Sequence, residues 1–390
     1  MPSSARGSMP ARRARGVLAI FAAIAVFLSM LAAASPARGA PDGRPHVRVL
    51  GPGVAITTYV DRRVPIRAYV LTVDPSQGAS IGIGLSNDRL AGLEQTTAMA
   101  KRLGAVVAVN GDFGYTSGRP VHPFALGGEL VQTSNALGVL FTIAADGTMG
   151  IAKPTQETVD VTEVDTGESW PIAAWNDGRP GTGEMTAYTA AGAGLDQPRP
   201  FTCSARLMPS GTASPTADGT SRTYTVDQSG CYSSSLSPGD GVVLSAAPTT
   251  DEATFLRSLS PGESMQIAWS FGLPGIVDAI GGDRLLVDHG QVALGPCVGS
   301  VCSRNPRTAI GLTADGRVLI VVVDGRQASS AGMSLLELAQ FMATRLGADV
   351  AMNLDGGGSS TMAVKGALQN HPGDGFERGV CSAVLVRLPH

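Results

Sequence analysis

The sequence has no concentrated block of positive or negative charge, and this absence excludes one class of partner. It contains 29 Lys and Arg residues against 32 Asp and Glu, which leaves a net charge of −3 over 390 residues. A nucleic-acid-binding surface needs lysine and arginine clustered on one face. No nucleic-acid partner is therefore predicted.

Several catalytic and metal-binding motifs are missing as well. There is no Gly-Lys-Ser/Thr, so a Walker loop is excluded, and there is no His-Glu-x-x-His metalloprotease motif. Ser359 and Ser360 lack the Gly-x-Ser-x-Gly context of a nucleophile elbow. The chemistry must therefore be sought outside these motifs.

Cysteine is scarce, and the five cysteines include no Cys-x-x-Cys pair. A zinc site is the competing interpretation, but no cluster of thiols with histidine supports it. In an oxidising compartment the spacing favours disulfides instead. We predict a small loop closed by Cys297 and Cys302 and a larger one closed by Cys203 and Cys231, with Cys381 left over.

The amino terminus has the order of a secretory signal. Arg12, Arg13 and Arg15 precede an apolar run over 17–34, which ends in three alanines. A charged, an apolar and a small-residue region in this order predict a cleaved signal peptide at 1–34, although the run is long enough for an uncleaved anchor. A linker at 35–46 and one catalytic domain at 47–390 follow. We expect a secreted protein, associated with a cell wall in a bacterium and free of the membrane after cleavage.

The rest of the chain has more strand patterns than helix patterns. Asp315-Gly316 joins two apolar runs as a hairpin. Residues 334–346 carry a capping box, formed by Ser334 and Glu337, followed by one buried stripe. Helix–strand pairs occur only twice, which favours an α+β fold with a mixed β-sheet core in a single large domain. The Ser/Thr/Gly-rich tract at about 203–240 is predicted to be a surface insertion.

One stretch of sequence occurs twice in similar form. "RLGAVVAVNGDF" at 102–113 resembles "RLGADVAMNLDGGGSSTM" at 345–362, and both pass from an apolar strand into Asn-x-Asp. Side chains alternate along a strand, so Asn110 shares a face with Asp112, and Asn353 with Asp355. A third apolar strand ends in Asp324. Asn/Asp-Gly turns alone would explain each cluster, but all three together predict a ligand site at the strand ends.

The second copy alone continues into three glycines, Gly356, Gly357 and Gly358, followed by Ser359 and Ser360. Consecutive glycines lose much conformational entropy on folding. A floppy surface turn is one interpretation; a close backbone approach, or amide groups forming an anion-binding nest, is the other. Arg307 lies next to a loop stiffened by proline and the predicted disulfide, and Arg326 lies at a strand end. A guanidinium group held in place can bind a phosphate or a carboxylate through paired hydrogen bonds. We predict an anionic ligand.

The stretches "AVNGDF", "AIGGDRLLVDHGQV", "NPRTAIGLTADGRVLIVVVDGR" and "NLDGGGSSTM" together resemble the phosphodiester glycosidase family. The resemblance implies hydrolysis of a sugar 1-phosphodiester, which frees a sugar such as N-acetylglucosamine. By motif position it implies roles for the residues singled out above: Asn110, Asp112, Arg307, Asp324, Arg326, Asn353, Asp355, the triglycine and Ser359. We expect that no cofactor is required, and a divalent cation such as calcium stays open as an alternative.

Asp355 is our candidate for the carboxylate nearest the sugar, as nucleophile or as base for water, with Asp324 or Asp112 assisting. The expected partner is a phosphorylated glycan of a cell wall, capsule or exopolysaccharide. Two alternatives remain open. One is metal-assisted cleavage of the P–O bond, and the other is a wall-glycan-binding protein without catalysis.

Overall fold

The computed structural model describes residues 45–389 of the chain. The predicted signal peptide lies outside this range, and so does the predicted linker apart from its last two residues. His46, the last of these, begins the first strand. No helix in the described range is long and apolar enough to cross a membrane.

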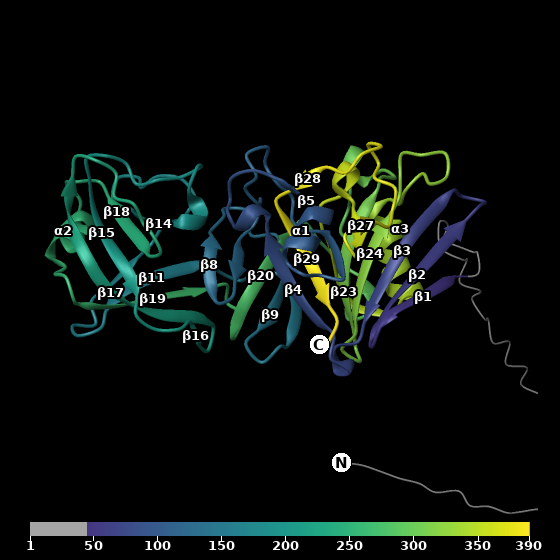
Figure 1. Cartoon of the computed structure of the whole chain (residues 1–390), viewed down its shortest axis with the longest axis horizontal. Helices are drawn as coiled ribbons and strands as arrows, with labels where there is room; N and C mark the ends of the chain where they lie inside the picture. The colour runs from purple at the N-terminus through teal and green to yellow at the C-terminus, as the bar shows by residue number, and fades with distance from the viewer. Residues whose placement is uncertain (1–44, 390) are drawn as a thin grey trace, which may run out of the picture. The chain divides into compact units, whose positions relative to one another are not determined.

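An eight-stranded sheet carries one wall of the candidate site (Figure 1). In spatial order its strands are β1 (His46–Gly51), β2 (Val54–Asp61), β3 (Ile66–Val73), β24 (Val318–Val323), β23 (Arg307–Thr313), β25 (Ala348–Asn353), β21 (Arg284–Asp288) and β22 (Gln291–Val292). The predicted hairpin at Asp315-Gly316 joins β23 to β24. Because β23 is antiparallel to both β24 and β25, these two strands end at the same edge of the sheet.

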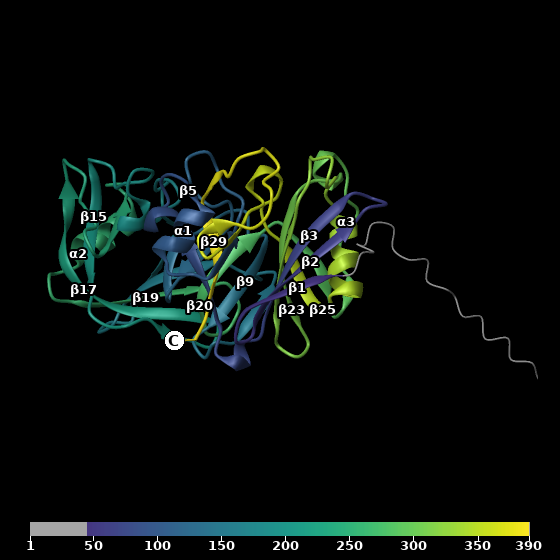
Figure 2. The same ribbon diagram turned by 45° about the vertical axis from the view of Figure 1, so that its right-hand side comes forward.

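The continuous apolar run of β24 is explained by burial on both faces. Val318, Ile320 and Val322 belong to one hydrophobic cluster, whereas the alternate residues of the strand belong to another. The second cluster includes Leu335 and Leu338 of α3 (Leu335–Gln340), which lies over this sheet (Figure 2). The predicted capping box is present at the start of α3, which continues as a π-helical turn, Phe341–Arg345. A strand with two apolar cores needs no polar face.

Two five-stranded sheets pack on the opposite face of the eight-stranded sheet, since Val109, Phe141 and Ile280 join its inner cluster. One contains β27 (Ala367–Leu368), β26 (Met362–Val364), β6 (Val107–Asn110), β29 (Ser382–Arg387) and β4 (Ser80–Leu85), and the other β10 (Met149–Ala152), β9 (Val139–Ala144), β20 (Ile276–Gly282), β7 (Phe124–Leu126) and β8 (Glu129–Gln132). Helix α1 (Thr96–Arg102) covers the outer face of the first through Met99 and Ala100. A two-stranded pair joins β5 (Glu94–Gln95) to β28 (Gly379–Val380).

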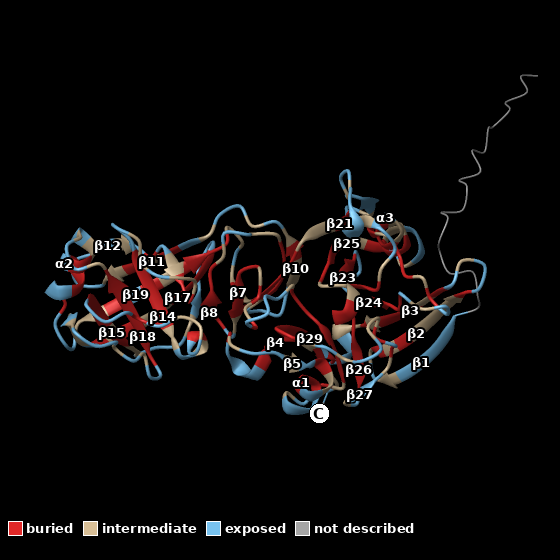
Figure 3. Ribbon diagram, turned by 90° about the horizontal axis from the view of Figure 1, so that it is seen from above, coloured by how far each residue is buried: buried red, intermediate tan, exposed pale blue. Residues whose placement is uncertain are grey.

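The Ser/Thr/Gly-rich tract is not a surface loop, which corrects the prediction for 203–240. It supplies strands of a nine-stranded sheet with a hydrophobic cluster that includes Ala205, Tyr224 and Val226. The strands are β11 (Thr158–Glu163), β12 (Ser169–Pro171), β13 (Ala174–Trp175), β14 (Met185–Thr189), β15 (Thr202–Pro209), β16 (Ser214–Pro215), β17 (Gly219–Tyr232), β18 (Val242–Ala246) and β19 (Ser264–Ser270). Buried residues run along β17 and β19 (Figure 3). Thr223 and Thr225 alternate with buried Tyr224 and Val226 along β17, and Ser204 and Thr220 are themselves buried, so composition alone misrepresents the tract.

The fold class is α+β, as predicted, with few helices among many strands in residues 45–389. Besides α1 and α3 it has α2 (Asp251–Ser258), whose Phe255 and Leu256 pack into the cluster of the nine-stranded sheet. Short 3-10 turns occur at Pro75–Gln77, Ser86–Asp88, Ala190–Gly192, Ser300–Cys302 and Gly357–Ser359. All named strand pairs are antiparallel except β13 with β14, so among the described residues the nine-stranded sheet is the mixed one.

Candidate active site

The two Asn-x-Asp segments meet, although they leave different sheets. The amide N–H of Asp355 donates to the carbonyl of Gly111 at 3.0 Å, and the side-chain amide of Asn110 donates to the carbonyl of Asp355 at 2.7 Å. From Asp355 the chain crosses through the triglycine from β25 into β26. The doubled sequence therefore forms two walls of one place in the fold.

Asn110 joins these walls and is fully buried. Its side-chain oxygen accepts from the hydroxyl of Thr308 at 2.7 Å and from the amide of Thr361 at 3.1 Å. With the bond to Asp355, these contacts use both the acceptor and the donor of the side chain. The structure therefore shows Asn110 as a clamp between strands, and its role in substrate binding stays a prediction.

Asp355 lies between two cavities. One, which we call the arginine cavity, has a volume of about 270 Å³ and is lined by Phe113, Ser300, Val301, Asn305, Arg307, Arg326, Asn353, Asp355, Gly356 and Gly357. The other, which we call the carboxylate cavity, has a volume of about 310 Å³ and is lined by Leu93, Asp112, Gly114, Tyr115, Thr116, Asp355, Ser359, Arg378, Gly379, Val380 and Cys381. Among these residues, Asp355 alone lines both.

The environment of Asp355 favours its protonated form. Burial raises the pKa of Asp355 to about 6, and the negative charge of Asp112 acts in the same direction. The Ser359 hydroxyl and the Gly356 N–H, at 2.8 Å, hydrogen-bond to the carboxylate and partly offset this effect. Asp355 therefore changes charge near neutral pH, as a carboxyl group in acid–base chemistry must.

Asp112, the second predicted carboxylate, forms a buried pair with His122. One carboxylate oxygen lies 2.6 Å from Nδ1 of His122, and the other accepts the backbone N–H of the same residue at 2.9 Å. Gly281 leaves room for the His122 side chain, because a Cβ on residue 281 would lie 2.2 Å from the Cβ of His122. Sequence reasoning did not assign His122 to the site, because a single histidine between two prolines has no motif.

Asp324 does not join these two carboxylates. It is buried, and one of its oxygens accepts from both the backbone amide of His371 at 2.9 Å and the side-chain amide of Asn370 at 3.2 Å. An imidazole nitrogen of His371 lies 3.4 Å from the other oxygen. Neither the arginine cavity nor the carboxylate cavity is lined by Asp324. We predicted that Asp324 assists Asp355. In the structure, Asp324 instead accepts hydrogen bonds from the segment at 370–371.

Asn353 lines the arginine cavity and is oriented by a residue that sequence reasoning missed. Its side-chain amide donates to Asp283 at 2.8 Å. Its buried side-chain oxygen has no hydrogen-bond partner among residues 45–389. A buried acceptor without a partner costs free energy unless a ligand satisfies it. This observation fits the predicted role of Asn353 in substrate binding.

The two predicted arginines have different surroundings. Arg307 is buried and donates to the carbonyls of Met333 at 2.8 Å and of Val301 and Ser303 at 2.6 Å. Burial lowers the pKa of Arg307 to about 10. Arg307 thus fixes the loop closed by the Cys297–Cys302 disulfide while contributing to the cavity wall. Arg326 has a more exposed guanidinium group, which hydrogen-bonds to Asn305 at 3.2 Å.

The triglycine permits close packing rather than forming the amide nest that we considered. The N–H of Gly356 donates to the Asp355 carboxylate, and that of Gly357 donates to the Pro306 carbonyl at 2.9 Å. Gly357 has a φ of +62°, and a Cβ on it would lie 3.0 Å from a guanidinium nitrogen of Arg326. The missing side chains therefore admit charged groups against the backbone. Of the two serines, Ser359 bonds to Asp355, and Ser360 is buried.

Both predicted disulfides, Cys203–Cys231 and Cys297–Cys302, are present. Cys381 is free and buried, and its thiol contacts the carbonyl of Asp112 at 3.3 Å. Burial raises the pKa of this thiol. Within residues 45–389, no three His, Cys, Asp or Glu side chains converge where they could hold a metal ion.

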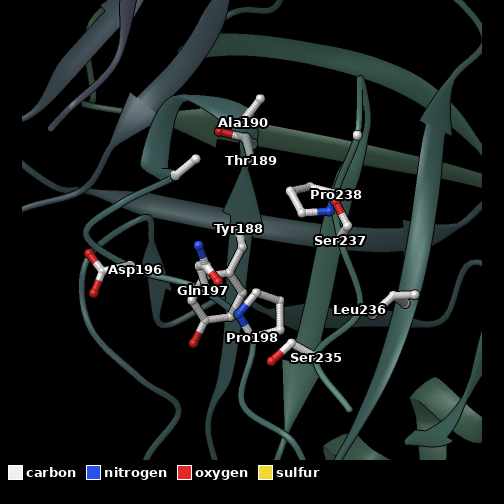
Figure 4. A pocket seen from close by; sticks show the side chains of 12 residues that line it. Tyr188, Thr189, Ala190, Asp196, Gln197, Pro198, Ser235, Leu236, Ser237 and Pro238 are labelled. Carbon is white, nitrogen blue, oxygen red and sulfur yellow. The ribbon is translucent and has the colours of Figure 1, made fainter.

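A separate cavity of about 360 Å³ lies beside the nine-stranded sheet, where Tyr188, Gln197 and Pro238 line it (Figure 4). Asp196 is the charged residue of its lining, which contains no lysine or arginine. An anionic ligand would meet a carboxylate there without a compensating cation. The arginine and carboxylate cavities are therefore the candidate site.

Comparisons with known proteins cover part of this chain. A protein-family model for phosphodiester glycosidases matches residues 212–387. The SPbeta prophage-derived uncharacterized protein YomE of Bacillus subtilis is 38% identical over 86 residues, which are 22% of this chain and 13% of that protein. The bovine N-acetylglucosamine-1-phosphodiester alpha-N-acetylglucosaminidase is 38% identical over 92 residues, which are 21% of this chain and 17% of that enzyme. The chain thus matches only a small part of either relative.

The fold also matches a solved structure, that of a hypothetical protein from Synechocystis. It aligns with a TM-score of 0.67 at 18% identity and covers 88% of this chain and 64% of that one. This likeness concerns the fold alone. The family match contains Arg326, Asp355 and the triglycine, whereas Asp112 precedes it. Residues 212–387 are thus similar to the phosphodiester glycosidase family.

Proposed function

We propose that this protein is an exported hydrolase that cleaves a sugar 1-phosphodiester at the glycosyl C–O bond and releases the free sugar from a phosphate group. The observation that carries the proposal is the position of Asp355, a carboxyl group with a raised pKa, between a cavity with two arginines and a cavity with a second carboxylate. The similarity of residues 212–387 to the phosphodiester glycosidase family supports the same reaction. The sugar that we propose is N-acetylglucosamine, as in the name of the bovine relative.

The phosphate group would occupy the arginine side. Guanidinium groups bind phosphate oxygens through paired hydrogen bonds, and Arg326 lies beside Gly357. A phosphate monoester has a second pKa of about 6, so it leaves more readily than a sugar alkoxide. The site then needs little help from a general acid on the leaving group. Charge complementarity to the phosphate supplies most of what this departure requires.

The sugar would occupy the carboxylate cavity. In a one-step reaction, Asp355 removes a proton from water, the water oxygen bonds to the anomeric carbon, and the C–O bond electrons leave with the phosphate. In a two-step reaction, Asp355 first bonds to the anomeric carbon, and water then replaces it. Asp112 is the second carboxylate in either case, held by His122. Exposed Tyr115 offers a flat apolar surface beside both.

Export and a wall, capsule or exopolysaccharide glycan as substrate are part of the same proposal. The two disulfides support an oxidising compartment. The predicted signal peptide, which lies outside the described residues, supports it independently.

Hydrolysis of a panel of sugar 1-phosphodiesters in oxygen-18 water tests the reaction. We expect label in the released sugar, because C–O cleavage leaves every phosphate oxygen unlabelled. Label in the phosphate would instead show the metal-assisted P–O cleavage described above. Glycan retention without turnover would show a binding protein. Asp355→Asn should lower turnover strongly, with the exposed Asp288→Asn as a control of equal charge change.

A further inference from the structure

Asp374 is a carboxylate that packs against the triglycine. Asp374 forms ion pairs with two arginines at once, with Arg326 at 3.1 Å and with Arg378. Its own side chain is 18% exposed, against 44% and 48% for the two arginines. The three side chains carry a surplus of one positive charge, which an anion could neutralise.

These groups are packed against bare backbone. A Cβ on Gly358 would lie 2.1 Å from a carboxylate oxygen of Asp374 and 2.5 Å from the central guanidinium carbon of Arg378. A Cβ on Gly357 would lie 3.0 Å from a guanidinium nitrogen of Arg326. An ordinary surface ion pair needs no such space. Two adjacent glycines therefore accommodate the two guanidinium groups and the carboxylate between them.

Arg326 also has an unusual backbone. Its φ is +61°, in the left-handed region that few residues other than glycine adopt. Its guanidinium group is oriented by two donations to the Asn305 side chain, at 3.4 and 3.2 Å. A strained backbone together with a fixed side chain is typical of a ligand site rather than of a solvated surface residue.

Arg378 connects this group to the reacting carboxylate. It lines the carboxylate cavity together with Asp355, and its positive charge acts on the pKa of Asp355. Arg326 lines the arginine cavity on the other side of Asp355. The two arginines thus flank the residue at which the proposed function places bond cleavage.

We propose that Arg326 and Arg378 form a two-arginine phosphate clamp and that Asp374 is its internal competitor, whose carboxylate holds both guanidinium groups until a phosphate displaces it. This inference rests on the proposed function for its place in catalysis, but not for the binding itself. A carboxylate accepts from two guanidinium groups much as a phosphate does. A phosphate monoester carries more negative charge than a phosphodiester, so the product would otherwise be held more tightly than the substrate. Competition by Asp374 then favours product release.

Calorimetric titration of the full chain with inorganic phosphate tests this proposal without any turnover. Asp374→Asn should bind phosphate about tenfold more tightly than the wild type, because the competing charge is gone. Asp88→Asn is the matched control. Asp88 also pairs with an exposed arginine, Arg102, which has a second carboxylate partner in Glu94. This control should change phosphate affinity less than twofold.

A second variant keeps the test independent of how Asp374→Asn folds. Arg378→Gln leaves Asp374 in place and should weaken phosphate binding about tenfold, since one arm of the clamp is lost. Unchanged or weaker binding by folded Asp374→Asn would overturn the competitor role, and unchanged binding by Arg378→Gln would overturn the clamp. If the wild type turns over sugar 1-phosphodiesters while these affinities stay constant, this inference fails and the proposed function stands. If phosphate binding responds as expected without turnover, the reverse holds.

Discussion

At the scale of single residues, three aspartates that look alike in the sequence have different surroundings in the structure. Asp112, Asp324 and Asp355 each follow an apolar strand. The structure gives Asp355 two cavities, pairs Asp112 with His122, and uses Asp324 to hold the segment at His371. Partners supplied by distant parts of the chain therefore set the chemistry of each aspartate.

Asp355→Asn should lower kcat by about 10² to 10⁴, since an amide can act neither as nucleophile nor as base. Steady-state kinetics measures this loss, and circular dichroism verifies that the variant is folded. In the wild type, kcat/KM should fall as the pH drops through about 6, the pKa to which burial raises Asp355. Full activity of the folded variant would contradict the assignment.

Asp355 should also make stability depend on pH in a defined direction. Its pKa is about 6 in the folded chain and near 3.9 in an unfolded one. The folded state therefore binds more protons between these values, and its stability falls as the pH rises through them. The Asp355 side chain lines two cavities, and this access to solvent reduces the energetic effect of the pKa shift. We expect the free energy of unfolding of Asp355→Asn to exceed that of the wild type by roughly 1–2 kcal/mol at pH 7, with no gain at pH 3.5. Urea unfolding at several pH values measures the difference.

Asp324→Asn should behave differently from Asp355→Asn. Oδ1 of Asp324 accepts from both His371 and Asn370, and Oδ2 faces the Tyr69 hydroxyl. An amide nitrogen at either position replaces a buried acceptor by a donor, and such a mismatch costs about 1–3 kcal/mol. The melting temperature should therefore fall, while residual kcat exceeds that of Asp355→Asn by at least tenfold. Equal loss of kcat in the two variants, at full stability, would return Asp324 to the catalytic group that the sequence predicted.

At the scale of elements, the 113–120 loop connects the site to the nine-stranded sheet and its turns. The loop carries Tyr115 and Thr116 into the lining of the carboxylate cavity. Near its end, Arg119 forms ion pairs with Asp177 and Asp196, both from the segment between β13 and β15. The inserted sheet thus supports a wall of the cavity without providing a catalytic residue.

Arg119→Ala should raise KM roughly fivefold to tenfold, with a smaller effect on kcat, because a displaced loop binds the sugar less well. Stability should change by no more than about 1 kcal/mol, since these ion pairs are only partly buried. Arg206→Ala is the control, as Arg206 forms an ion pair with Asp227 within the same sheet. An equal effect of both substitutions on KM would argue against a specific support of the loop.

At the scale of the whole molecule, the nine-stranded sheet shares its core with the rest of the chain. Ala125, Leu140 and Ala279 belong to the neighbouring five-stranded sheet, yet they pack in the same cluster as Val161 and Leu244. The described residues, 45–389, accordingly form one compact unit. The insertion is thus part of a continuous structure.

This shared core predicts a single cooperative unfolding transition. Melting the nine-stranded sheet alone would expose the apolar face of the five-stranded sheet, so the two should unfold together. Differential scanning calorimetry should then give equal calorimetric and van't Hoff enthalpies. Two resolved transitions would show that the inserted sheet is an independent domain.

Local sequence signals specify several elements and some of their ends. The capping box of Ser334 and Glu337, the Asp315-Gly316 hairpin and the Cys297–Cys302 disulfide follow from short-range geometry, which a few neighbouring residues specify. The family resemblance followed from motifs of the same kind. Residues 203–240 were misread because serine and threonine are frequent both in loops and on the exposed faces of strands.

Only the tertiary structure decided how these elements serve one site. Asp355, Asp112 and His122 come from segments far apart in the chain, and no periodicity encodes which of them share a cavity. The triglycine shows this most clearly, because its composition predicted an unusual backbone but not the reason for it. That reason is the space that Arg326 and Arg378 need beside Asp355, and it arises only where two sheets meet.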